Sequence, residues 1–133
     1  MLVIDASILV VALADDDTPG DLVRARLRGE VLAAPEIVDL EVGSVLRRLV
    51  KGRNVLPKRA TLALSDLDAM PLDRVSHRAL MVRCWELRDN LTMYDAAYVA
   101  LAELLDATLL TGDRRLSRAT GPQCPIEVID VAR

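Results

Sequence analysis

The sequence predicts an α/β protein with three layers, in which helices cover both faces of a central parallel sheet. Short apolar segments typical of strands alternate along the chain with longer segments typical of helices. The strand segments show too little alternation of apolar and polar residues for a sheet that faces solvent, which indicates a sheet that is buried on both faces. A length of 133 residues and an apolar content of 52% suffice for one closed core, so we expect a single domain over residues 1–133.

In the first half of the chain, runs of β-branched and small apolar residues predict strands over residues 2–4 and 31–34. Thr18 is expected to cap the second helix, with Pro19 at its first position, and Gly52 to end the third. Helices are expected over residues 6–14, 19 to about 28, 36 to about 51, and 57 to about 70.

In the second half, residues 71–75 fit either a strand or an extended connector. A helix is expected from Ser76 or His77 to about Arg88, and the clearest helical segment of the sequence covers residues 92–106. The remaining elements are a strand over 107–111, a short helix over 113–118 and a final strand over 126–129.

The charge and the aromatic content restrict how this chain could bind nucleic acid. A net charge of -3 argues against an all-over electrostatic attraction to a polyanion. With one Trp, two Tyr and no Phe, the chain lacks the aromatic residues of proteins that stack single-stranded bases. Nucleic acid would have to be held by a metal ion or by local arginine clusters, although each cluster also fits a solvated helix face. The clusters lie at residues 24–28, 47–48 and 114–115.

Two further features concern the compartment. Cys84 and Cys124 have no metal-ligand spacing and are expected to be free thiols in a reducing environment. The apolar start of the chain is interrupted by Asp5 and lacks a basic leader, so we expect neither a signal peptide nor a membrane span. These features predict a cytoplasmic protein.

Two aspartates directly follow predicted strands. Asp5 comes after the strand at residues 2–4, and Asp113 follows the strand at 107–111 through Gly112. Since the carboxyl ends of parallel strands share one edge of a sheet, both acids are expected at that edge, where α/β proteins bind ligands. Either residue could instead serve only as the N-cap of the helix that follows it.

Two more acids lie in predicted helices. Asp95 stands three residues after Thr92, a spacing that also fits a capping box. Glu41 borders the apolar stripe of its helix, where a carboxylate needs a cation or a hydrogen-bond donor. A surface ion pair with Arg47 or Arg48 is the structural alternative for Glu41.

If these four acids converge, their mutual repulsion requires a proton or a bound cation. A cluster of carboxylate oxygens without His or Cys suits Mg²⁺ or Mn²⁺ and not zinc. Such a site is well suited to phosphodiester cleavage by a metal-activated water. The chain offers no other set of catalytic residues, because its one histidine, His77, has no nucleophile turn to work with and is interpreted as structural or solvated.

Four blocks of the sequence, in order and in spacing, resemble the PIN-domain ribonucleases, and among these the VapC toxins of bacterial toxin–antitoxin pairs. The blocks are VIDAS at residues 3–7, DLEV at 39–42, LTMYDAAYVALA at 91–102 and LLTGDRRL at 109–116. The resemblance covers essentially the whole chain.

The resemblance implies a metal-dependent endoribonuclease with its acids at the carboxyl edge of a parallel sheet. Asp5 and Asp95 would be the principal ligands of Mg²⁺ or Mn²⁺, and Glu41 and Asp113 would complete the cluster directly or through water. Ser7 and Thr111 would orient the carboxylates through their hydroxyls. The resemblance also implies RNA as substrate, a homodimer, and a VapB-like antitoxin whose tail covers the site.

Two other functions are alternatives to the nuclease. A phospho-acceptor receiver domain has a similar length and architecture, but it would require paired acids after the first strand and a late lysine. Here Ala6 and Ser7 follow Asp5, and Lys51 and Lys58 lie mid-chain. A binding module that keeps the fold without turnover is the other alternative, and the presence of all four acids argues against it.

Overall fold

The computed structural model describes residues 1–131, in which five strands form one parallel sheet. The strands are β1 (Leu2–Ile4), β2 (Leu32–Pro35), β3 (Leu72–Val75), β4 (Thr108–Thr111) and β5 (Ile126–Val128). Residues 71–75 therefore resolve as a strand, because β3 pairs with β2 along its whole length.

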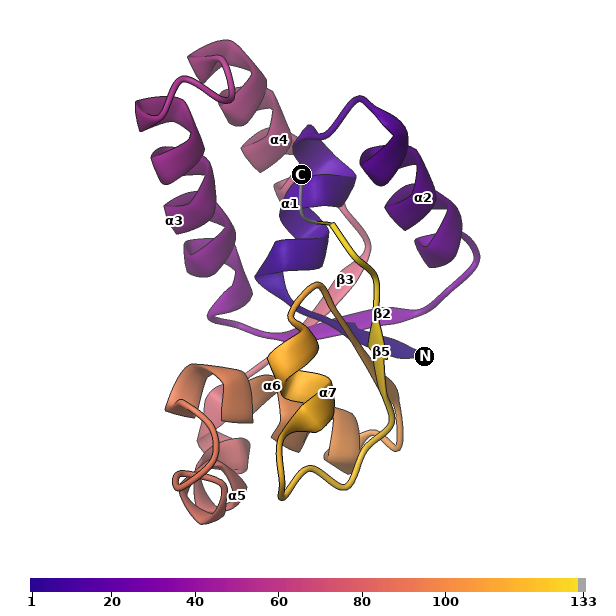
Figure 1. Ribbon diagram of the computed structural model, residues 1–133, viewed down its shortest axis with the longest axis vertical. Coiled ribbons are helices and arrows are strands. Elements are labelled where there is room, and N and C mark those ends of the chain that lie inside the picture. Colours follow the sequence, from indigo (N-terminus) through magenta and orange to yellow (C-terminus); the bar gives the residue numbers. More distant parts are fainter. Residues whose placement is uncertain (132–133) are drawn as a thin grey trace.

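Helices cover both faces of the sheet, which confirms the predicted three-layer α/β/α fold. They are α1 (Ala6–Ala14), α2 (Thr18–Leu27), α3 (Val38–Lys51), α4 (Pro57–Ala69), the 3-10 turn η1 (His77–Leu80), α5 (Met81–Glu86), α6 (Met93–Leu104) and α7 (Arg114–Arg118). Helices α2, α3 and α4 pack against α1, whereas α5 packs against α6 and α6 contacts β1, β2 and β4. Figure 1 shows these two groups on opposite sides of the strands.

The strand order is β3-β2-β1-β4-β5, so the chain leaves β1 toward one side of the sheet and later returns to its other side at β4. The carboxyl ends of β1 and β4 therefore flank the point where the connections diverge, which is where open α/β sheets bind ligands. Receiver domains have the order 2-1-3-4-5. The sheet order thus separates this chain from the receiver alternative.

The core is one aliphatic cluster that runs through the sheet and both helical layers. Residues 96–102 of α6 are all buried, and four of these seven residues are alanines. Small side chains let the helix axis approach the sheet closely. The helix that carries Asp95 is consequently fixed against β1, β2 and β4.

Three expected boundaries were wrong. Helix α3 begins at Val38, two residues late, because the N–H of Glu36 still donates to the carbonyl of Val75 and prolongs the β2–β3 pairing. The expected helix from residue 76 or 77 to 88 is split into η1 and α5. Helix α2 begins at Thr18 itself, with Asp17 at the N-cap and no side-chain capping bond.

The sequence also made predictions about membrane spans and about the state of the two cysteines. No helix within residues 1–131 combines the length and the apolar character needed to cross a bilayer. Cys84 is buried, Cys124 is partly buried, and both are free thiols, as the sequence predicts.

Candidate functional site

The site is built on the neighbouring strands β1 and β4. Their register pairs Ile4 with Leu110, so Asp5, the first residue after β1, lies beside Thr111, the last residue of β4. The N–H of Asp5 donates to the carbonyl of Leu110 at 3.4 Å. The structure therefore brings Asp5 and the segment leading to Asp113 to one edge, as expected from the sequence.

Three donors hold the carboxylate of Asp5. The hydroxyl of Ser7 donates to its Oδ1 at 2.6 Å, and the backbone N–H of Ile8 donates to the same oxygen at 3.2 Å. The hydroxyl of Thr111 donates to Oδ2. Asp5 is thus the N-cap of α1, but the Thr111 contact comes from a strand 106 residues away and is not part of a helix cap.

Ser7 and Thr111 also connect Asp5 to the loop after β4. The N–H of Gly112 donates to Oγ of Ser7 at 3.1 Å, and the N–H of Asp113 donates to Oγ1 of Thr111 at 3.0 Å. A Cβ on Gly112 would lie 2.6 Å from Cγ2 of Val131 and 3.1 Å from Oγ of Ser7. Glycine at position 112 therefore lets the loop close onto the hydroxyl that holds Asp5.

Glu41 enters the site from α3 and is held by Tyr98 of α6. Its N–H makes an early hydrogen bond of the helix, to the carbonyl of Ile37 at 3.0 Å, so Glu41 lies in the first turn and close to the end of β2. The buried hydroxyl of Tyr98 donates to its Oε1 at 2.6 Å. This contact replaces the predicted alternative of an ion pair with Arg47 or Arg48.

Sequence analysis missed the role of Tyr98. Tyr98 belongs to the block at residues 91–102 and lies three positions after Asp95, therefore on the same face of α6. That spacing was the available signal. The partner on α3 could not be found from the sequence, because 57 residues separate Tyr98 from Glu41.

Asp95 and Asp113 both lie at helix N-termini. Thr92 caps α6 by accepting the N–H of Asp95 at 3.1 Å, which is one half of the predicted capping box. Asp113 caps α7 by accepting the N–H of Arg115 at 2.9 Å, and it also binds the guanidinium of Arg115 at 3.1 Å and 2.8 Å. A position at a helix N-terminus therefore does not prevent either residue from also belonging to the site.

The acids are close enough to affect one another electrostatically. Burial raises the pKa of Asp5 and of Glu41 above their ordinary values, against the hydrogen bonds that each accepts. The charge of Asp95 raises the pKa of both further. Burial likewise raises the pKa of Asp95 itself, Thr92 opposes this rise, and the charge of Asp113 adds to it.

Asp113 differs from the other three acids. The hydrogen bonds from Arg115 are the main cause that holds the pKa of Asp113 below its ordinary range. The positive charge of Arg115 also lowers the pKa of Asp95. The site therefore contains three acids whose negative charge is disfavoured and a fourth that an arginine already neutralises.

The donor set suits a hard divalent cation by its chemistry. All four side chains offer carboxylate oxygens, and burial and mutual repulsion both favour a cation among them. Within residues 1–131, however, no three acidic, histidine or cysteine side chains stand close enough together to hold a metal ion jointly. Three of the carboxylates instead bind neighbouring side chains: Asp5 binds Ser7 and Thr111, Glu41 binds Tyr98, and Asp113 binds Arg115.

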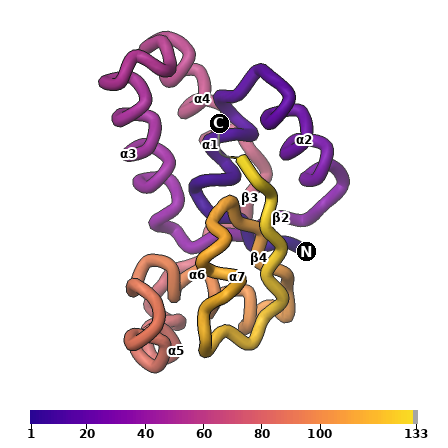
Figure 2. Tube along the Cα trace, viewed as in Figure 1, coloured from indigo at the N-terminus to yellow at the C-terminus, as the bar shows by residue number. Residues whose placement is uncertain are grey.

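A separate groove of about 710 Å³ lies between α1, the α3–α4 connection and the end of the described chain. Figure 2 shows the chain after β5 running back toward α1. Apolar side chains and the acids of residues 15–17 line this groove, but none of the four predicted site acids does. The candidate site is therefore an open sheet edge and not this cavity.

Comparison with known proteins agrees with this geometry. The family model described as PIN domain matches residues 2–122. The chain belongs to the PIN-domain family. Ribonuclease VapC1 of Mycobacterium tuberculosis is 40% identical over 128 residues, with 96% of each chain covered, so this PIN domain is of the VapC type.

Solved structures show the same fold at lower identity. The crystal structure of VapBC2 from Rickettsia felis, bound to a DNA fragment from their promoter, matches with a TM-score of 0.69 at 18% identity, covering 96% of this chain and 97% of that one. Mycobacterium tuberculosis VapC20, a toxin that cleaves the sarcin-ricin loop, matches with a TM-score of 0.62 at 15% identity, covering 82% and 87% of the two chains. At these identities the likeness supports the PIN-domain architecture.

Proposed function

We propose that this PIN domain is an endoribonuclease that acts as the toxin of a toxin–antitoxin pair in the cytoplasm. The proposal is supported by the electrostatic proximity of four acids near the carboxyl edge of the sheet: the charge of Asp95 raises the pKa of Asp5 and Glu41, and the charge of Asp113 raises the pKa of Asp95. The ribonuclease name of its 40% identical relative VapC1 supports RNA as substrate. The Rickettsia felis VapBC2 pair supports a VapB-like antitoxin as partner.

We infer that the reaction depends on a divalent cation, Mg²⁺ or Mn²⁺, with Asp5 and Asp95 as its principal ligands. Glu41 and Asp113 would complete the set, directly or through water. When bound, such a cation supplies an activated water and neutralises charge on the phosphate. Ser7 and Thr111 fix the orientation of the Asp5 carboxylate, and Tyr98 does the same for Glu41.

The test is cleavage of a labelled RNA by the purified chain with Mg²⁺, with Mn²⁺ and after removal of metal by EDTA. Asp5→Asn and Asp95→Asn should each lower the cleavage rate by at least about a hundredfold, because an amide is a poor ligand for a hard cation. EDTA should abolish cleavage by the unaltered chain, and added Mg²⁺ or Mn²⁺ should restore it.

Asp21→Asn provides the matched control, since Asp21 is an exposed acid of α2 that forms an ion pair with nearby Arg24. It should cleave RNA at the rate of the unaltered chain. Full cleavage by Asp5→Asn, or full cleavage in EDTA, would contradict the nuclease proposal. Tight binding of metal and RNA without any turnover would favour the binding module instead.

A further inference from the structure

Arg115 is the cation that acts on the candidate site, and its side chain is almost entirely exposed. Its accessible fraction is 87%, yet its Nε and Nη2 both reach the carboxylate of Asp113, at 3.1 Å and 2.8 Å. Because Asp113 is only two residues away, the long side chain folds back over the start of α7. An exposed guanidinium thus covers the carboxylate of Asp113.

This ion pair is of the kind that exchanges partners easily. Exposed salt bridges contribute little to stability, because water screens the attraction and the long side chain loses freedom. Nothing buried depends on this guanidinium, since the N-cap of α7 is made by the backbone N–H of Arg115 and not by its side chain. Release of the side chain would therefore leave α7 intact.

A polyanion that approaches the site meets three partly buried acids and the guanidinium of Arg115. The planar fork of arginine donates two parallel hydrogen bonds to a phosphate as readily as to a carboxylate. A phosphodiester beside these acids needs a nearby positive charge to offset their repulsion. Because the net charge of the chain is -3, the protein as a whole does not attract a polyanion. Arg115 is placed to supply that charge locally.

We propose that Arg115 is a phosphate-binding residue of the site, which neutralises Asp113 in the free chain and turns to a backbone phosphate of bound RNA. The inference rests on the proposed nuclease function and assigns the residue that receives the substrate.

The first measurement is Mn²⁺ affinity by calorimetry in the absence of RNA. Arg115→Gln removes the competitor for Asp113 and a positive charge near Asp95, so its affinity for Mn²⁺ should increase severalfold. Arg114→Gln is the matched control, since Arg114 is the adjacent exposed arginine and pairs with Asp130 on the far end of the chain. The control should bind Mn²⁺ as the unaltered chain does.

The second measurement is the steady-state cleavage of a labelled single-stranded RNA of mixed sequence at several salt concentrations with saturating Mn²⁺. Arg115→Gln should raise KM about tenfold with a smaller effect on kcat, and the dependence of log(kcat/KM) on log salt should become shallower by about 0.7, the value for one lost phosphate contact to a single strand. Arg115→Lys keeps the positive charge but loses the two parallel N–H donors of the guanidinium, so its KM should lie between those of the unaltered chain and Arg115→Gln.

An unchanged KM and salt dependence in Arg115→Gln would overturn the inference, as would equal changes in Arg114→Gln. If the unaltered chain cleaves RNA and only these arginine results fail, the nuclease function stands and the assignment of Arg115 falls. If no protein cleaves RNA, the function itself fails, and an unchanged Mn²⁺ affinity in Arg115→Gln would then also refute the pairing with Asp113.

Discussion

At the scale of single residues, Asp95 shows that the site is held against a local electrostatic cost. The residue lies in the first turn of α6, where the helix dipole favours a negative charge by about 0.3–1 kcal/mol. The pKa of Asp95 is nevertheless raised, because burial and the neighbouring charge of Asp113 outweigh the hydrogen bond with Thr92 and the charge of Arg115. The ionised carboxylate therefore destabilises the folded chain in the absence of a cation.

Asp95→Asn should accordingly make the metal-free protein more stable while it abolishes cleavage. A raised pKa means that the folded state binds the proton more tightly than the unfolded state, so the cost of ionisation is present above the folded pKa. In EDTA at neutral pH, Tm should rise by up to about 4 °C, which for a chain of this size corresponds to about 1 kcal/mol.

The difference in Tm between Asp95→Asn and the unaltered chain should shrink as the pH falls from the folded pKa of Asp95 toward the ordinary value of 3.8. Below pH 3.8 the difference should be gone. Thermal unfolding across that pH range, for Asp95→Asn beside Asp21→Asn, checks the result. A lower Tm of Asp95→Asn at neutral pH in EDTA would contradict it.

At the scale of elements, α6 connects the core to the site. Its first turn carries Asp95, its second carries Tyr98, and the residues from Ala96 to Ala102 are buried between the sheet and α5. A change in the buried part of α6 therefore affects both the stability of the fold and the position of two site residues.

Leu101→Ala should lower the free energy of unfolding by about 2–5 kcal/mol, since Leu101 is fully buried and its truncation leaves a cavity. Leu104→Ala, three residues along the same helix, makes the same chemical change at a side chain that is 63% exposed and should cost no more than about 0.5 kcal/mol. Urea denaturation measures both. Equal losses of unfolding free energy in the two variants would contradict the burial of this face of α6 against the core.

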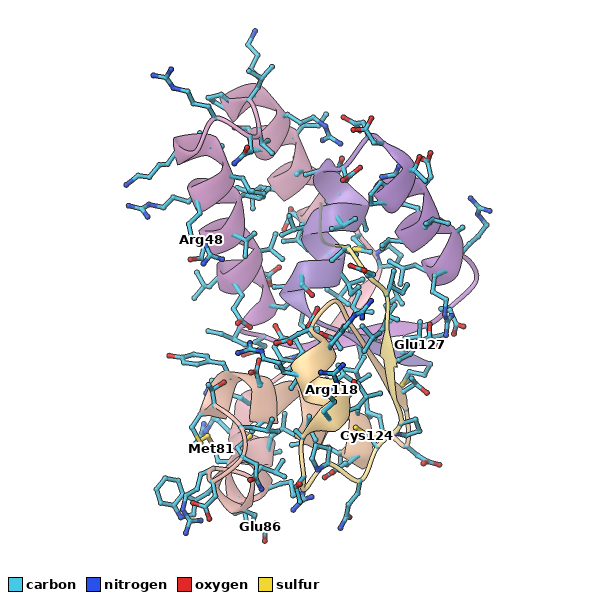
Figure 3. All side chains as sticks on the ribbon, in the orientation of Figure 1. Arg48, Met81, Glu86, Arg118, Cys124 and Glu127 are labelled. Atoms are coloured by element: carbon cyan, nitrogen blue, oxygen red, sulfur yellow. The ribbon has the colours of Figure 1, made fainter. Side chains whose placement is uncertain are left out.

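At the scale of the whole molecule, one ion pair links the two ends of the chain. Arg26 of α2 donates from Nε to Glu127 of β5 at 2.7 Å across a sequence separation of 101 residues. Figure 3 labels Glu127 on β5, the last strand of the sheet. The hydrogen bond with Arg26 is the main cause of the lowered pKa of Glu127.

Glu127→Gln should therefore destabilise the protein at neutral pH, by about 0.5–1 kcal/mol because both side chains are partly exposed. A lowered folded pKa means that the stabilisation is present above the ordinary value of 4.5 and is lost as the pH falls through the folded pKa. Urea denaturation at neutral pH and at about pH 3 should show the difference only at neutral pH. A difference that persists in acid would point to packing and not to charge.

Much of the fold could be predicted from the sequence because the signals are local. Short, mostly apolar runs indicated four strands, longer segments with start and stop signals indicated the helices, and weak alternation indicated a parallel sheet covered on both sides. The boundaries at Val38 and at His77 were wrong, because pairing of Glu36 with β3 and the split into η1 and α5 depend on contacts between elements.

For the candidate site, too, the features that could be predicted are local and those that could not are contacts between distant residues. The sequence alone determined that Asp5 and Asp113 follow strands and that Asp95 begins a helix, because each position is fixed by its immediate neighbours. The tertiary structure was needed to show that Tyr98 binds Glu41, that Asp5 is the carboxylate which Thr111 binds, and that Arg115 covers Asp113. The first two contacts join residues 57 and 106 positions apart, and the third depends on which of several partners a long flexible side chain chooses, so no local pattern encodes them.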